Sequence, residues 1–414
     1  MKPLRLLLVG IGGYGNTYVE LLKRRLADGA GEVAIAGVAD PLAERAPGYA
    51  WLQSLGVPFY DSPEAFYAQH TAELAVISTP IPLHGAHCAC ALKHGSHVLV
   101  EKPLCPTIQE AAALAALSRE TGRFLAVGFQ WSYSAPILAL KRDILAGRLG
   151  RPITLKSYVS WQRFRAYYTN SWRGRRRDGQ GRLTLDCVLT NATAHYLHNL
   201  FFLAGASGEA PALDRAETPD WALAEAYRVK PDMEMPDLFV LRGGLPCGAD
   251  FWYGCSYSLA GPQTTRFHCR YEYGEVLFNE ETADDHVRAR FADGSETDYG
   301  NPQTPQEIGR KLDACIRAAM GDRIALTCTA ETAMPHIRTA NSLLQALPGC
   351  PVPPDCLTEL TDRNGDGGVF AAGLDEALLG CYRQGRLPGE AGLAWSMEPT
   401  MVFPGKCERW GESK

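Results

Sequence analysis

The sequence predicts an α/β protein, with an N-terminal Rossmann domain of the doubly wound type and an α+β domain after it. Three observations carry this prediction. A strand-like segment at residues 4–9 runs directly into the glycine loop of residues 10–15. Short apolar segments then alternate with helical patterns as far as residue 127, which is typical of a parallel sheet. From residue 153 onward, longer strand-like segments predominate.

The elements of the first part follow one another regularly. After the glycine loop, apolar residues recur at helical spacing, and a second expected strand at residues 33–38 ends in Ala39-Asp40. This strand–turn–helix–strand unit has the length of half a βαβ repeat. Further strands are expected at residues 74–78, 97–100 and 124–127, and further helices at residues 83–93 and 108–119.

The second part has a different pattern. Helices are expected at residues 135–145, 305–320 and 330–347, and strands at residues 153–161, 238–241, 249–258, 264–278 and 287–291. Gly and Asp turns between these strands favour a large, mostly antiparallel open sheet with one covered face. We therefore predict three regions. Residues 1–130 form the Rossmann domain, residues 131–348 form the α+β domain, and the Pro- and Gly-rich residues 349–414 form an extension packed on it.

The composition excludes several classes of protein. A net charge of -5 argues against a nucleic-acid-binding protein, which would normally have a basic domain. No apolar run approaches the length of a membrane span, and 46% hydrophobic with 21% charged residues is typical of a globular protein. The 13 cysteines contain no Cys-x-x-Cys pair, so free thiols in a reducing compartment and a cytoplasmic location are expected.

The glycines after the first strand have the spacing Gly-x-Gly-x-x-Gly. Gly10 allows a tight turn, Gly12 lets the backbone approach a pyrophosphate, and Gly15 lets the strand and helix pack closely. The phosphates would then lie at the helix N-terminus. Because the loop follows a strand and opens a helix, its context favours dinucleotide binding. An ordinary glycine turn in another α/β protein is the alternative.

A carboxylate, Asp40, ends the second expected strand. There it can accept hydrogen bonds from both ribose hydroxyls of NAD, and it would repel the 2′-phosphate of NADP. NAD is therefore favoured over NADP, although the nearby Arg45 would weaken the preference. The structural alternative is that Asp40 caps the segment that follows.

The expected strand at residues 97–100 ends in Glu101-Lys102-Pro103. Ligands of open α/β sheets bind at the carboxyl ends of the strands. Pro103 ends the pairing of this strand and biases Lys102 away from helical conformation. Taken alone, the Glu-Lys pair could equally be a surface ion pair at the end of a strand.

Together, the glycine loop, Ser78-Thr79-Pro80-Ile81-Pro82-Leu83-His84 and Glu101-Lys102-Pro103 resemble the Gfo/Idh/MocA family of NAD(P)-dependent oxidoreductases. Its members act mainly on sugars, inositols and related polyols. The resemblance covers residues 4–200 by motif and the second domain by pattern, and Ile81 stands where the family often has Asn. It implies that these residues bind the cofactor: Gly10, Gly12, Gly13, Tyr14, Gly15, Asp40, Ser78, Thr79, Pro80, His84, Glu101 and Lys102.

The resemblance also implies the catalytic residues. Lys102 would donate a hydrogen bond to the reacting oxygen, and a histidine would move the proton, because its pKa lies near working pH. The family places that histidine in an Asp-x-x-x-His pattern after a Gly-rich stretch, and His195 matches it. Asn191 occupies the usual Asp position, and Asp186 matches by its distance from the glycines but lies five residues too far away. Either residue would orient His195, and the chain resembles a variant subgroup; a plain core histidine is the alternative.

Seven arginines lie between residues 163 and 182, and the family often carries a Trp-Arg pair in this region. Trp172 and Arg173 are therefore candidates to contact a carboxylate, a phosphate or a sugar face of the substrate, together with Lys102, His195 and His198. A solvated basic loop, or a loop paired with acids of a second subunit, is the alternative. No metal is expected, because a catalytic zinc site needs three protein ligands.

These inferences combine into one function. We expect an NAD-dependent oxidoreductase that transfers hydride between a sugar, sugar acid, inositol or related polyol and nicotinamide. By family analogy, a homodimer or homotetramer is expected. Two alternatives stay open, an NAD-dependent glycoside hydrolase of the same fold and a non-catalytic NAD-binding regulatory protein.

Overall fold

The computed structural model describes residues 2–27, 29, 31–169, 172–231, 233–322 and 326–411. These form two compact units. Unit 1 contains the described residues up to Cys105, together with Gln109–Ser134 and Thr304–Ala333. Unit 2 contains Pro106–Ile108, Ala135–Gln303 and the described residues from Met334 onward.

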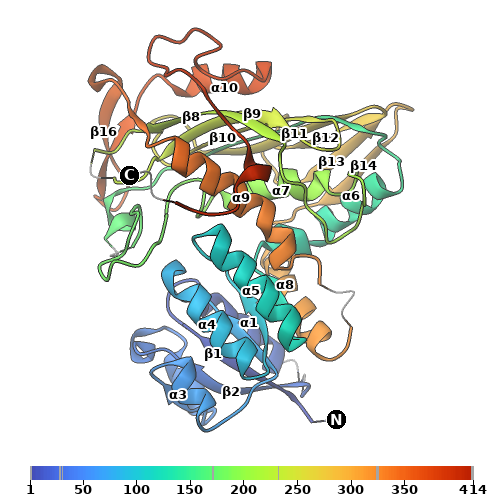
Figure 1. Cartoon of the computed structure of the whole chain (residues 1–414), viewed down its shortest axis with the longest axis vertical. Coiled ribbons are helices and arrows are strands. Elements are labelled where there is room, and N and C mark those ends of the chain that lie inside the picture. The colour runs from blue at the N-terminus through green and yellow to red at the C-terminus, as the bar shows by residue number, and fades with distance from the viewer. Residues whose placement is uncertain are drawn as a thin grey trace. The chain divides into compact units, whose positions relative to one another are not determined.

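Unit 1 is built on a six-stranded parallel sheet with the order β3-β2-β1-β4-β5-β6 (Figure 1). Its strands are β1 Leu4–Val9, β2 Val33–Ala39, β3 Phe59–Tyr60, β4 Leu74–Ile77, β5 His97–Val100 and β6 Leu125–Val127. Its helices include α1 Gly15–Ala27, α2 Tyr49–Ser54, α3 Pro63–Tyr67, α4 Ile81–Lys93, α5 Ile108–Thr121 and α8 Pro305–Ala319. The strand order reverses between β1 and β4, the place where ligands bind in such sheets. The Rossmann prediction is confirmed.

Helix α8 is the main surprise of unit 1. The sequence placed residues 305–320 in the second domain, but Leu312, Cys315 and Ile316 pack into the hydrophobic core of the Rossmann sheet. These residues lie on one face of a strongly amphipathic helix. The amphipathic pattern shows that the helix must bury one face, but it does not show which sheet receives that face.

Unit 2 is built on a ten-stranded sheet with the order β14-β13-β12-β11-β7-β10-β9-β8-β15, and β18 pairs with β8. Its strands are β7 Pro152–Ser160, β8 Trp221–Arg228, β9 Leu238–Gly244, β10 Asp250–Ser256, β11 Thr264–Tyr271, β12 Gly274–Phe278, β13 Val287–Phe291, β14 Glu296–Gly300, β15 Cys350–Pro351 and β18 Thr400–Val402. Only the β7–β10 and β8–β15 pairs are parallel among the described strands of this sheet. The predicted mostly antiparallel sheet is thus confirmed.

The prediction of one strand in this sheet is wrong, and several strands, β8 among them, were not predicted. Residues 264–278 form two strands, β11 and β12, which pair as a hairpin through a turn at residues 272–273. Strand β8 was not predicted, because its Ala- and Glu-containing sequence has no strong β-forming pattern.

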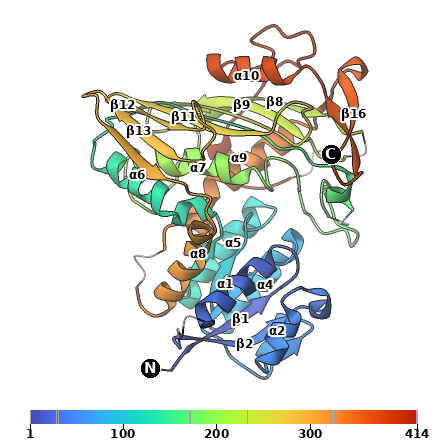
Figure 2. The same cartoon turned by 180° about the vertical axis from the view of Figure 1, so that it is seen from behind.

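The sheet of unit 2 is covered by helices on both faces. The prediction of one covered face was therefore wrong. Helix α10 (Asp375–Gln384) lies on one face, and α6 (Ala135–Leu145), α7 (Ala194–Ala204) and α9 (Ala330–Ala346) lie on the other (Figures 1 and 2). Strand β10 is accordingly buried at six consecutive positions. Consecutive buried residues are what two covered faces require, since side chains alternate between the faces.

The C-terminal extension also forms a two-stranded hairpin, β16 (Leu357–Thr361) with β17 (Gly367–Ala371). The turn between them holds the Asp362–Asp366 segment, whose backbone amides donate to the Asp362 carboxylate. In the part of the chain that the structure describes, no helix is long and apolar enough to cross a membrane.

Candidate functional site

The glycine loop of unit 1 has a different requirement at each glycine. Gly10 has a φ of +79°, and a Cβ on Gly15 would lie 2.3 Å from the carbonyl oxygen of Gly10. The backbone conformation of Gly10 and the close packing at Gly15 therefore explain why glycine occupies these two positions, without reference to a ligand. Gly12 has ordinary φ, and a Cβ there would meet nothing within 4 Å. Open space in front of this backbone fits a bound pyrophosphate, so the loop is suited to a dinucleotide.

Asp40 is tied to the glycine loop. Its Oδ2 accepts a hydrogen bond from the Ile11 amide at 2.9 Å, and its Oδ1 accepts one from the Leu42 amide at 2.9 Å. A carboxylate has about four acceptor positions, so two remain for ribose hydroxyls. The capping role and the cofactor role that the sequence left as alternatives are therefore compatible.

We expect Asp40→Asn to change the choice of cofactor. The amide keeps the shape and one acceptor for the Ile11 amide, but it removes the negative charge that faces a 2′-phosphate. The ratio of the dissociation constants for NADP⁺ and NAD⁺, measured by titration, should fall about tenfold or more. Glu20→Gln, which removes an exposed charge on α1, is the matched control. An unchanged ratio in Asp40→Asn would remove Asp40 from cofactor selection.

The loop after β4 is joined to the loop after β5 by His84. Its Nδ1 lies 2.8 Å from the Pro103 carbonyl oxygen, and its Nε2 lies 2.8 Å from the Thr79 carbonyl oxygen. Burial lowers the pKa of His84, although these carbonyls act in the opposite direction. Ser78 completes the arrangement, because its hydroxyl donates to the Gly10 carbonyl at 2.8 Å. His84 and Ser78 thus hold the predicted cofactor loops in place.

Glu101, at the end of β5, is the centre of a buried polar cluster. The Tyr18 hydroxyl donates to its Oε1 at 2.6 Å, Lys311 Nζ forms an ion pair with the same oxygen, and the Lys102 amide donates to Oε2 at 3.3 Å. Gly128 makes room for this carboxylate, since a Cβ there would lie 2.8 Å from Oε1. The neighbour of Lys102 is therefore anchored, which restricts the backbone that carries the lysine.

Lys311 is a residue that the sequence reasoning missed. Its side chain is completely buried, and it also donates to the Tyr14 hydroxyl at 3.0 Å. Burial acts to lower the pKa of Lys311, but the charge of Glu101 outweighs it, and the pKa lies above its ordinary value. A signal existed in the sequence, because Lys311 shares a helix face with the apolar Cys315.

In unit 2, the two candidate partners of His195 are joined to each other. The Asn191 side-chain amide donates to Asp186 Oδ1 at 2.7 Å and to the Tyr167 hydroxyl at 3.1 Å. The Gly174 amide donates to the other Asp186 oxygen at 2.7 Å. Although Asp186 lies five residues further from His195 than the family pattern predicts, its carboxylate is still hydrogen-bonded to the side chain of Asn191. Tyr167 is a further member that the sequence did not single out.

The two histidines of α7 lie in different surroundings. His195 is the second residue of the helix and is half-buried, four residues after Asn191. His198 is 1% exposed. Burial, and then the charges of His336 and Lys141, place the pKa of His198 well below its ordinary value. These surroundings favour an interior role for His198, and His195 is the better placed of the two to meet a ligand.

Trp172 and Arg173 belong to a cluster of aromatic rings and arginines. The Arg173 guanidinium lies 4.5 Å from the centroid of the Tyr167 ring and 5.3 Å from that of Trp172. The Arg163 guanidinium lies 5.2 Å from the centroid of the Tyr167 ring and 5.3 Å from that of the Tyr257 ring. Each guanidinium also donates one hydrogen bond to a backbone carbonyl, Arg173 Nη1 to that of Tyr167 at 3.3 Å and Arg163 Nη1 to that of Gln162 at 3.0 Å. The cation–π contacts themselves use no hydrogen-bond donor.

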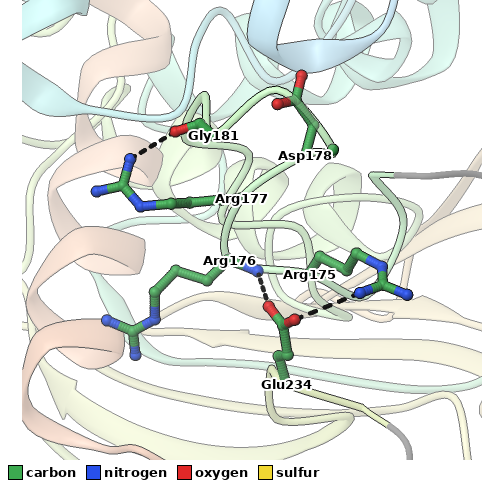
Figure 3. A pocket seen from close by; sticks show the side chains of 7 residues that line it. Arg175, Arg176, Arg177, Asp178, Gly181 and Glu234 are labelled. Atoms are coloured by element: carbon green, nitrogen blue, oxygen red, sulfur yellow. Dashed lines mark hydrogen bonds and ion pairs between the residues drawn. The ribbon is translucent and has the colours of Figure 1, made fainter.

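The outer arginines of the same segment line a pocket of about 590 Å³. Figure 3 shows that these arginines meet acceptors of the protein itself. Arg177 Nη1 donates to the Gly181 carbonyl at 2.7 Å, and Glu234 accepts from the Arg176 amide at 2.9 Å and pairs with Arg175 at 3.5 Å. The side chains of Arg175 and Arg177 thus have acceptors within this chain, and Arg175 has a carboxylate partner in Glu234.

Among the described residues, no group of three or more His, Cys, Asp or Glu side chains is arranged to hold a metal ion. The structure describes all thirteen cysteines, and none of them forms a disulfide bond.

Comparison with known proteins gives a family match for the first part of the chain. Residues 4–129 match the model described as "Oxidoreductase family, NAD-binding Rossmann fold" (GFO_IDH_MocA). Inositol 2-dehydrogenase of Streptomyces avermitilis is 34% identical over 150 residues, which are 36% of this chain and 42% of that protein. A 1-carboxy-3-chloro-3,4-dihydroxycyclohexa-1,5-diene dehydrogenase of Comamonas testosteroni is 32% identical over 148 residues, 34% of this chain and 35% of that protein. The aligned segments thus span between a third and about half the length of the curated relatives.

Solved structures extend the fold match across most of the chain. The WlbA dehydrogenase of Bordetella pertussis, solved with NADH and UDP-GlcNAcA, has a TM-score of 0.64 at 20% identity and covers 82% of this chain and 95% of its own. An oxidoreductase of Agrobacterium radiobacter, solved with NAD⁺, L-tartaric acid and magnesium, has a TM-score of 0.65 at 15% identity, covering 82% and 94%. At these identities the likeness shows the shared fold of both domains.

Proposed function

The N-terminal domain of this chain belongs to the Gfo/Idh/MocA family of NAD-binding oxidoreductases, and from this premise we propose that the protein is an NAD-dependent dehydrogenase of a sugar, sugar acid, inositol or related polyol. The observation that carries the proposal is the combination of a dinucleotide-compatible glycine loop with an anchored Lys102 in one domain. The similarity to an inositol 2-dehydrogenase supports the substrate class.

The cofactor-binding residues proposed from the sequence remain the same. The backbone around Gly12 and Gly13 would hold the pyrophosphate, and Asp40 would hold the ribose and favour NAD over NADP. Tyr14, Thr79 and Pro80 would contact the cofactor, and Ser78 and His84 would position the loops that hold it. NAD⁺, when bound, supplies the hydride acceptor.

The chain's own residues would handle the proton and the reacting oxygen. We assign Lys102 the role of donating a hydrogen bond to the substrate oxygen, where negative charge develops as the hydroxyl proton leaves. His195 would accept that proton as a general base and return it in the reverse reaction. Asn191, held by Asp186, would orient His195 without bringing a full carboxylate charge directly to its side. We further propose a homo-oligomer, as the family analogy implies.

We expect His195→Asn to lower kcat about 100-fold, because general acid–base catalysis typically contributes a factor of this size or more. The dissociation constant for NAD⁺ should stay unchanged, so rate and binding are measured separately. His198→Asn is the comparison: its interior position predicts a lower stability with less direct effect on the chemistry. Equal kcat in wild type and His195→Asn would remove His195 from the reaction.

The function itself is tested by screening NAD⁺ reduction across sugars, sugar acids and inositols, with Lys102→Ala as the blank. NADH formation with one group of these substrates, absent in the blank, is the expected result. Cleavage of a glycoside without net NADH would support the glycoside hydrolase instead. NAD⁺ binding without turnover in any assay would support a regulatory protein.

A further inference from the structure

A second cavity in unit 2, of about 310 Å³, lies beside the Arg173 cluster. The described residues of its walls come from three parts of the chain: Arg165 to Thr169 with Arg173 to Arg175, Lys230 with Pro231 and Met233, and Gly368 with Val369 of strand β17. Among the described lining residues there is no carboxylate, and four side chains are cationic: Arg165, Arg173, Arg175 and Lys230. A volume of this size lies within the range of about 300–1,000 Å³ that small-molecule sites occupy.

Lys230 is held in a fixed position at this cavity by contacts of its own side chain. It is only 7% exposed, its Nζ donates to the Val369 carbonyl of β17 at 2.7 Å, and it lies 3.9 Å from the centroid of the Phe370 ring. The buried Asp237 accepts hydrogen bonds from the Val229 and Lys230 amides and balances part of the charge. Because an ammonium carries three donors and the described residues use one, Lys230 retains donors for a ligand.

Two further donors at the cavity have no acceptor among the described residues. Arg173 Nε and the Tyr168 hydroxyl are both buried without a hydrogen-bond partner there. Buried donors in native proteins are almost always satisfied, so each requires an explanation. A ligand with several acceptor oxygens would satisfy both, and the surrounding positive charge selects an anion.

The cavity is connected to the segment that carries His195. Arg173 stacks on Tyr167, whose hydroxyl accepts from Asn191, and Gly174 of the cavity wall donates to Asp186. The C-terminal hairpin contributes Gly368 and Val369 to the lining, and it is joined to the segment of Arg165, because the Asp366 carboxylate accepts from the Ala166 amide at 2.8 Å. Residues of the extension are therefore part of the cavity and not only a cover on the sheet.

We propose that this cavity binds the carboxylate or phosphate group of the substrate through Arg173 and Lys230. The substrate would then be a sugar acid or a phosphorylated sugar or polyol. That the cavity binds an anion is inferred from the cavity alone. That this anion is part of the substrate rests on the proposed function. It gives the C-terminal extension a direct part in recognition through β17.

Isothermal titration of the full chain tests the proposal with D-glucuronate, D-glucose 6-phosphate and neutral D-glucose as probes. At least one anion should bind about tenfold or more tightly than glucose, and which one does so distinguishes carboxylate from phosphate. Arg173→Gln and Lys230→Met should each raise the dissociation constant of that anion about 10- to 100-fold. Arg176→Gln, in the same segment but outside the cavity, is the matched control and should bind as wild type does.

Because Lys230 is buried, thermal unfolding must show that Lys230→Met folds; Arg165→Gln, at an exposed position of the wall, provides a second variant. Equal affinity for all three probes, or wild-type affinity in Arg173→Gln, would overturn the proposal. The outcome is separable from that of the proposed function. Anion binding without NADH formation leaves the cavity assignment standing, and NADH formation from neutral sugars alone, unaffected in the variants, leaves only the dehydrogenase standing.

Discussion

Replacing Lys102 by alanine is expected to lower kcat about 1,000-fold while the protein stays folded and still binds NAD⁺. The size follows from the role proposed for the ammonium group: removing one preorganised donor to a developing oxyanion typically costs a factor of about 100 to 1,000. Lys102 is half-buried at the end of β5, so its removal leaves no large cavity. The loss should therefore appear in the rate and not in the stability.

Single-turnover measurement of NADH formation checks this expectation, with the dissociation constant for NAD⁺ measured in parallel by titration. Lys93→Ala is the matched control, since Lys93 is an exposed lysine of the same unit in the last turn of α4. It should behave as wild type. If Lys102→Ala formed NADH at the full rate, Lys102 would be removed from the reaction, although the dehydrogenase activity itself would stand.

Replacing Lys311 by methionine is expected to destabilise the protein by about 3–5 kcal/mol. The substitution leaves the buried Glu101 without its cationic partner, and removing one member of a buried ion pair has an effect of this size. The Tyr18 hydroxyl would remain as a donor to the carboxylate, but it brings no compensating charge. Urea unfolding followed by tryptophan fluorescence measures the loss.

The double variant Lys311→Met with Glu101→Gln identifies the cause. Because the uncompensated charge is then absent, the double variant should recover part of the stability lost in Lys311→Met alone, and the double-mutant cycle gives the coupling energy between the two side chains.

The pH dependence of the stability has a defined sign as well. Since the pKa of Lys311 is raised above 10.5 in the folded protein, the stability that this shift contributes is fully present below pH 10.5 and is lost as the pH rises through the folded value. A loss below about 1 kcal/mol in Lys311→Met would mean that the pair contributes as little as an exposed one.

The parts that the sequence predicted well are those whose signal is local. The strand at Leu4–Val9, the glycine loop after it and the strand that ends at Val100 each follow from a short apolar run bounded by glycine, proline or charge. The helix at Ala135–Leu145 follows from apolar spacing in the same way. For each of these, the residues that determine the element are neighbours in the chain, so one window of sequence contains the information.

The parts that the sequence could not supply depend on pairing between distant segments. Strand β8 has a weak local pattern and forms because β9 offers it a partner. Helix α8 carries a clear apolar face, yet nothing within the helix shows that the Rossmann sheet will receive it. Propensity is a weak signal that tertiary contacts override, and these elements are where that happens.

The candidate site divides along the same line. By itself, the sequence determined that a glycine loop, an acid after β2 and Glu101-Lys102 occur in the order of a dinucleotide-binding domain, because each motif lies within a few residues at the end of a strand. Only the tertiary structure decided that Lys311 pairs with Glu101, 210 positions away, and that Lys230 donates to Val369, 139 positions away. Such contacts arise where the packing of whole elements brings side chains together and excludes water from them, and no short stretch of sequence records that packing.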